Sequence, residues 1–125
     1  MNRAIQESNG FTLVEVAAGL ILLAVGLLGI AAMQVTSTQG DSFSRHLTQA
    51  TVFAQDRMEY LKSLSYNDSD LSGGEHNEGT LPETIFSRQY HIVEDVGNSM
   101  KTITVTVQWA DRGNHRIAIS TIRSK

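Results

Sequence analysis

The chain has 125 residues, a formal net charge of −3 and no cysteine. A chain of this length has room for one membrane helix and one small soluble domain. The absence of cysteine excludes disulfide bonds within the chain and a thiolate nucleophile. The ten Lys and Arg residues form no dense basic patch, so we expect no nucleic-acid partner.

Residues 11–33 form an apolar run in which Glu15 is the only charged residue. At 1.5 Å per residue a helix of this length spans roughly 34 Å, which is enough to cross a hydrocarbon core of about 30 Å. The run lacks a polar stripe, so a helix formed by it must be surrounded by lipid or by other apolar helices. Arg3 favours a cytoplasmic N-terminus.

Glu15 is an unusual residue at the start of such a run, because carboxylates inside membranes usually have a partner. The run contains no Lys, Arg or His. A cation arises only if the chain is cut after Gly10, since Phe11 would then carry a free amino group. Alternatively, Glu15 lies at the membrane edge in contact with water and has no role. The charge alone leaves both interpretations open.

The stretch Gly10-Phe11-Thr12-Leu13-Val14-Glu15-Val16 resembles the processing site of type IV prepilins. The resemblance implies that residues 1–10 are a leader peptide, that prepilin peptidase cleaves after Gly10, and that Phe11 becomes N-methylated. It also implies a role for Glu15 in methylation and in subunit recruitment. Residues 11–33 would then be the transmembrane and assembly helix.

The continuation of this run, residues 24–34, is similar to the PilV type of minor pilin. The chain departs from many major pilins, because it has no proline near the end of this segment and no disulfide. The resemblance implies a structural minor pilin that takes part in type IV pilus assembly. Its partners would be major and minor pilins, prepilin peptidase and the inner-membrane assembly machinery. It would reside in the inner membrane with a periplasmic C-terminal domain, and later in the pilus fibre at the cell surface.

Three alternatives remain. Pseudopilins of type II secretion systems share the same leader and helix. A single-span membrane anchor with a small ligand-binding domain would be uncut at Gly10. A secretory signal peptide would need a small-x-small site, which Gly29-Ile30-Ala31 supplies, but the apolar run is longer than is usual for signal peptides.

Residues 34–66 are predicted to continue the helix into water as an amphipathic segment. Its apolar residues recur at helical spacing, with Arg57 or Met58 at one ambiguous step. Gly40 is a candidate bend. The other members of the predicted apolar face are Phe43, Leu47, Ala50, Ala54, Leu61 and Leu64.

Residues 67–83 are predicted to be an acidic loop, because they include Ser72-Gly73-Gly74 and Pro82 and carry five carboxylates without Lys or Arg. The run Asn67-Asp68-Ser69-Asp70 offers oxygen ligands for calcium. It lacks the glycine and distal glutamate of an EF-hand loop, so a solvated acidic loop is the favoured interpretation.

Residues 84–125 are predicted to form an antiparallel sheet. Three segments alternate apolar and polar residues, at 86–93, 103–109 and 117–120. Asp111-Arg112-Gly113-Asn114 is a good hairpin turn. A fourth strand from the preceding loop is left open. The expected fold is therefore α+β, pilin-like, with a long N-terminal helix packed on three to four antiparallel strands and Trp109 in the helix–sheet core.

We find no pattern that predicts an enzyme, a cofactor or a metal site. The four histidines, His46, His76, His91 and His115, have no partner at metal-ligand spacing. No serine lies in a Gly-x-Ser-x-Gly sequence and no glycine-rich phosphate loop follows a strand.

Overall fold

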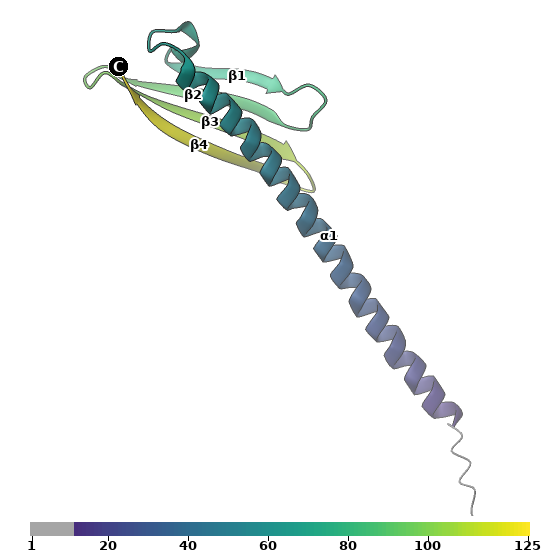
Figure 1. The fold of residues 1–125 in the computed structure, drawn as a ribbon. Coiled ribbons are helices and arrows are strands. Elements are labelled where there is room, and N and C mark those ends of the chain that lie inside the picture. Colours follow the sequence, from purple (N-terminus) through teal and green to yellow (C-terminus); the bar gives the residue numbers. More distant parts are fainter. Residues whose placement is uncertain (1–11) are drawn as a thin grey trace, which may run out of the picture. The chain divides into compact units, whose positions relative to one another are not determined.

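The computed structural model describes residues 12–125, which form one helix, a short 3-10 helix and four strands (Figure 1). In chain order these are α1 (Leu13–Ser63), the 3-10 helix Ser69–Leu71, β1 (Gly74–Thr80), β2 (Ser87–Asp95), β3 (Met100–Ala110) and β4 (Asn114–Ser124). The predicted α+β fold, a long N-terminal helix on an antiparallel sheet, is confirmed. The chain divides between Asp41 and Ser42 into two compact units. We call residues 42–125 the head.

The first unit contains the apolar half of α1. The helix continues without interruption through Gly40, so the sequence signal for a bend does not end it. The hydroxyls of Thr36 and Thr38 donate to the carbonyls of Ala32 and Gln34, one turn earlier. These hydroxyls are satisfied within the helix, which lowers the cost of placing them next to an apolar surface.

In the head, α1 contributes one narrow apolar face to the core. Ala50, Ala54, Met58 and Leu61 are buried, which confirms the central part of the predicted face and assigns the ambiguous step to Met58. The two alanines have no exposed surface. Their small side chains let the helix backbone approach the sheet closely.

The sheet is an antiparallel meander in the order β1-β2-β3-β4. β3 and β4 extend beyond the predicted segments 103–109 and 117–120 at both ends, and β2 covers the predicted segment 86–93 except for Phe86. The prediction of a loop throughout residues 67–83 is wrong for Gly74–Thr80, which form β1 and supply the fourth strand. This segment has no apolar alternation, so its own sequence carried no strand signal. Its conformation is set by pairing with β2, with a bulge between Asn77 and Gly79.

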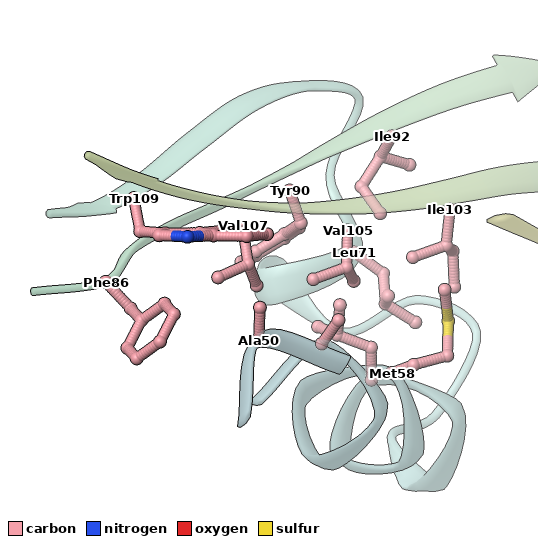
Figure 2. Close-up of a cluster of buried hydrophobic side chains, with 12 residues drawn as sticks. Ala50, Met58, Leu71, Phe86, Tyr90, Ile92, Ile103, Val105, Val107 and Trp109 are labelled. Atoms are coloured by element: carbon pink, nitrogen blue, oxygen red, sulfur yellow. The ribbon is translucent and has the colours of Figure 1, made fainter. Parts of the chain in front are cut away.

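The core lies between the helix and one face of the sheet (Figure 2). Along β3 every second residue from Lys101 to Trp109 is buried. The alternating sequence predicted this for residues 103–109 but not for Lys101. Trp109 is 4% exposed and packs near the rings of Phe43, Phe86 and His115. Its predicted place in the helix–sheet core is confirmed. The opposite face of the sheet is polar and rich in threonine.

Candidate assembly site

The first described residues form a capping box at the start of α1. The backbone N–H of Glu15 donates to the hydroxyl of Thr12 at 3.2 Å, and the backbone N–H of Thr12 donates to Oε2 of Glu15 at 3.1 Å. This reciprocal pair satisfies two of the backbone donors that a helix start leaves unpaired. The negative charge of Glu15 is also favourable at this end of the helix dipole.

The cap gives Glu15 a local role that our sequence analysis missed. The signal was present, because Thr-x-x-Glu directly before an apolar run is the sequence signature of a capping box. Only one oxygen of the Glu15 carboxylate, Oε2, accepts the hydrogen bond from the Thr12 N–H. A carboxylate has roughly four lone-pair sites on its two oxygens. Glu15 can therefore keep its hydrogen bond to Thr12 and still accept a second hydrogen bond from a cationic group.

The two other predicted site residues, Gly10 and Phe11, lie outside the described residues. Cleavage after Gly10 and methylation of Phe11 therefore stay predictions.

The surface of α1 next to the cap is apolar on all sides. An 18-residue window of the helix has a mean hydropathy of 2.6, and none of the window is buried within the protein. The helix is thus long and apolar enough to cross a membrane. A Cβ atom added at Gly19, Gly26 or Gly29 would meet nothing within 4 Å, so this surface is flat there and open to another backbone.

A scan against protein-family models, a search of curated proteins and a search of solved structures each found no match. The function must be inferred from the residues of the chain itself.

In the head, most carboxylates of the acidic segment bind groups of the protein. Asp68 caps the short 3-10 helix by accepting from the backbone of Asp70, and Asp70 accepts from the hydroxyl of Tyr60. Within residues 12–125 no group of three or more His, Asp or Glu side chains is placed to hold a metal ion. The calcium alternative gains no support from this geometry.

Glu78, on the bulge of β1, ties the edge of the sheet to the helix. Its carboxylate binds Arg57 of α1 and, at 2.6 Å, Arg88 of β2, and all three side chains are mostly buried. Arg88 also donates to the backbone carbonyl of Phe53 in the helix, at 3.1 Å. One carboxylate thus links α1, β1 and β2.

Lys101 has the same function at the other end of the core. Its side chain is buried, and its ammonium donates to the carbonyls of Tyr66 and Leu71, each at 2.9 Å. It also lies 3.3 Å from Glu94 and over the ring of Tyr66. A buried lysine with these partners fixes the chain between α1 and β1 against the central strand.

The four histidines make different contacts and do not form one cluster. His46 lies 3.0 Å from Asp111 without hydrogen-bond geometry, His76 stacks on Tyr90, and His91 is exposed. His115 contacts the aromatic cluster around Trp109. Burial, reinforced by the charge of Asp70, raises the pKa of the Tyr90 hydroxyl above its usual value.

Proposed function

We propose that this chain is a pilin-like membrane subunit, a structural minor pilin of the PilV type that takes part in type IV pilus assembly. The observation that carries the proposal is the junction at Thr12. A capping box that includes the single acidic residue of the run starts an apolar helix directly after Gly10-Phe11. This is where the sequence resembles a prepilin processing site.

In the proposed assembly, α1 passes from lipid into a bundle of pilin helices. Contacts between apolar helices replace contacts with lipid, so the segment need not meet water. The glycines at 19, 26 and 29 allow close approach of neighbouring helices. The second carboxylate oxygen of Glu15 would accept a hydrogen bond from the Phe11 amine of the same or a neighbouring subunit. That pairing would fix the register between subunits.

The proposal assigns no enzymatic activity and no cofactor to the chain. The covalent chemistry is done to it, at Gly10 and Phe11, by prepilin peptidase. The head would be periplasmic before assembly and exposed on the fibre afterwards, with the N-terminus in the cytoplasm at first.

The test is the intact mass and N-terminal peptide of the protein from membranes with and without active prepilin peptidase. We expect a chain that starts at N-methylated Phe11, and its loss when the peptidase is removed. A chain that starts at Met1 in both membranes would overturn the proposal and favour the single-span anchor. A start just past Ala31 would instead indicate a secreted domain.

A mature chain starting at Phe11 would still fit a type II secretion pseudopilin. Shearing the cells separates the two, since a pilus subunit is released with the fibres in proportion to the major pilin. A pseudopilin stays with the cell and is required for export of secreted proteins.

A further inference from the structure

The two edges of the sheet differ in length and regularity. β1 has seven residues and a bulge, whereas β4 has eleven residues paired without a break to β3. In the part of the chain that the structure describes, the outer edge of β4 pairs with no other strand. A long, regular edge presents a row of free backbone donors and acceptors to any extended chain.

The two edges also differ in charge. Residues 67–83, which include β1, carry five carboxylates and no Lys or Arg. Glu78 among them is bound by Arg57 and Arg88, while Glu75 and Glu83 are exposed. Residues 111–125, which include β4, carry four Lys and Arg against the single carboxylate of Asp111. Two β4 edges would repel each other, while a β4 edge and a β1 edge attract.

The order and direction of the strands decide which of these pairings two chains anchored in the same membrane can form. In a meander of four antiparallel strands, β1 and β4 run in opposite directions. A second head placed beside the first in the same orientation therefore brings its β1 antiparallel to β4. In this arrangement the first residue of the head, Ser42, lies at the same end of both heads. Antiparallel pairing of two β4 edges would instead turn one head around.

We propose that β4 of one copy pairs antiparallel with β1 of a second copy, so that neighbouring heads share one continuous sheet. This rests on the membrane anchoring in the proposed function, but not on cleavage or methylation. The cross-strand partners define one row across the polar face, Asn77-Gln89-Thr106-Ala118. A direct continuation of this row sets Ala118 of one copy opposite Asn77 of the next.

Cysteine cross-linking tests the pairing cleanly, because the chain has no cysteine of its own. Full-length Ala118→Cys and Asn77→Cys proteins are mixed in lipid vesicles and oxidised, and the adducts are identified by mass. We expect the mixed adduct to dominate over both homodimers. The control is Thr106→Cys, which lies in the same row but on a central strand and should form little adduct with either partner. Ser120→Cys with Glu75→Cys, in a neighbouring row, provides a second pair.

A charge variant tests the electrostatic part. Arg116→Glu reverses an exposed charge on β4 and should lower the mixed adduct about threefold, because a carboxylate would then face the acidic β1 segment of the neighbouring copy. Arg45→Glu makes the same change in net charge on the exposed side of α1 and should have no effect. Melting followed by Trp109 fluorescence checks that each variant is folded.

Dominant Ala118→Cys homodimers, equal adducts from Thr106→Cys, or no adduct from either pair would overturn the proposal. The mass of the N-terminal peptide, measured on protein from cells, reports the proposed function separately. An unprocessed chain that still gives the mixed adduct would overturn that function and leave the strand pairing intact.

Discussion

The carboxylate of Glu15 has two separable properties, its hydrogen bond to the helix start and its charge. Glutamine can replace glutamate in a capping box, so Glu15→Gln keeps the bond to the Thr12 N–H and removes only the charge. If pairing with the Phe11 amine fixes register, this variant should enter the membrane normally but reach sheared pili roughly tenfold less, which corresponds to about 1.4 kcal/mol. Quantitative immunoblots of membranes and sheared fibres measure both amounts.

Thr12→Ala is the matched control for Glu15→Gln. It removes the hydroxyl that caps the Glu15 N–H, at a typical cost of about 1 kcal/mol to the helix start, and keeps the charge. We expect it to assemble far better than Glu15→Gln. If the two variants assemble alike, the cap is the important property and the charge pairing is wrong.

Tyr90 should make the head sensitive to alkali. Its folded-state pKa is raised, chiefly by burial and then by Asp70. The folded protein therefore holds this proton more tightly than the unfolded chain does. The stabilisation is complete below the unfolded pKa and is lost as the pH rises through the folded pKa.

The variant Tyr90→Phe keeps the ring and removes the titrating group. Between about pH 9 and about pH 11, either side of the usual tyrosine pKa, it should lose less free energy of unfolding than the unchanged protein. Urea denaturation at each pH gives the comparison. The control is Tyr66→Phe, which keeps the ring beneath the Lys101 ammonium and should follow the unchanged protein. A Tyr90→Phe curve parallel to that of Tyr66→Phe would contradict the assignment.

The connection from α1 to β1 is bound by the buried ammonium of Lys101. Replacing Lys101 with methionine keeps the apolar stem but removes the donor for two carbonyls, those of Tyr66 and Leu71. We expect the free energy of unfolding to fall by roughly 2–4 kcal/mol, because hydrogen bonds from charged groups are lost and a buried carbonyl is left unpaired. Chemical denaturation followed by Trp109 fluorescence measures this, since Trp109 is the only tryptophan.

Lys62→Met is the comparison for Lys101→Met. It removes a lysine from the exposed last turn of α1 and should change the free energy of unfolding by no more than about 0.5 kcal/mol. An equally small effect of Lys101→Met would mean that its two carbonyl bonds contribute nothing to the fold.

The sequence predicted well those elements whose conformation follows from their own pattern of apolar and polar residues. The alternation in β3 and the helical spacing from Ala50 to Leu61 follow from burial of one face, and both were visible. β1 could not be recognised as a strand from its sequence, because a polar segment such as Gly-Glu-His-Asn becomes a strand only by pairing with its neighbour β2. The contacts of Glu78 and Lys101 were hidden for a similar reason. They join residues from separate elements, and no local spacing indicates them. At the candidate site, the Thr12–Glu15 cap was readable from its motif, whereas pairing with Phe11 depends on other subunits.

At the scale of the whole molecule, the two units make different demands on their surroundings. Every described residue of the first unit is exposed, so its apolar surface needs lipid or other helices. All buried core residues lie between Ala50 and Trp109, within the head. The head therefore has its own core, to which residues 12–41 contribute no buried side chain.

A fragment that starts at Ser42 should accordingly fold by itself in water. It retains the helical face, the four strands and both the Glu78 and Lys101 contacts, and we expect a free energy of unfolding of roughly 4–12 kcal/mol from its size. Its urea transition, followed by Trp109 fluorescence, should be cooperative and should match that of the full chain in detergent. A fragment that starts at Gln55 loses Ala50 and Ala54 and should show no cooperative transition. If the Ser42 fragment also shows no cooperative transition, the head needs the first unit or neighbouring subunits in order to fold. The unit that starts at Ser42 is then not independently stable.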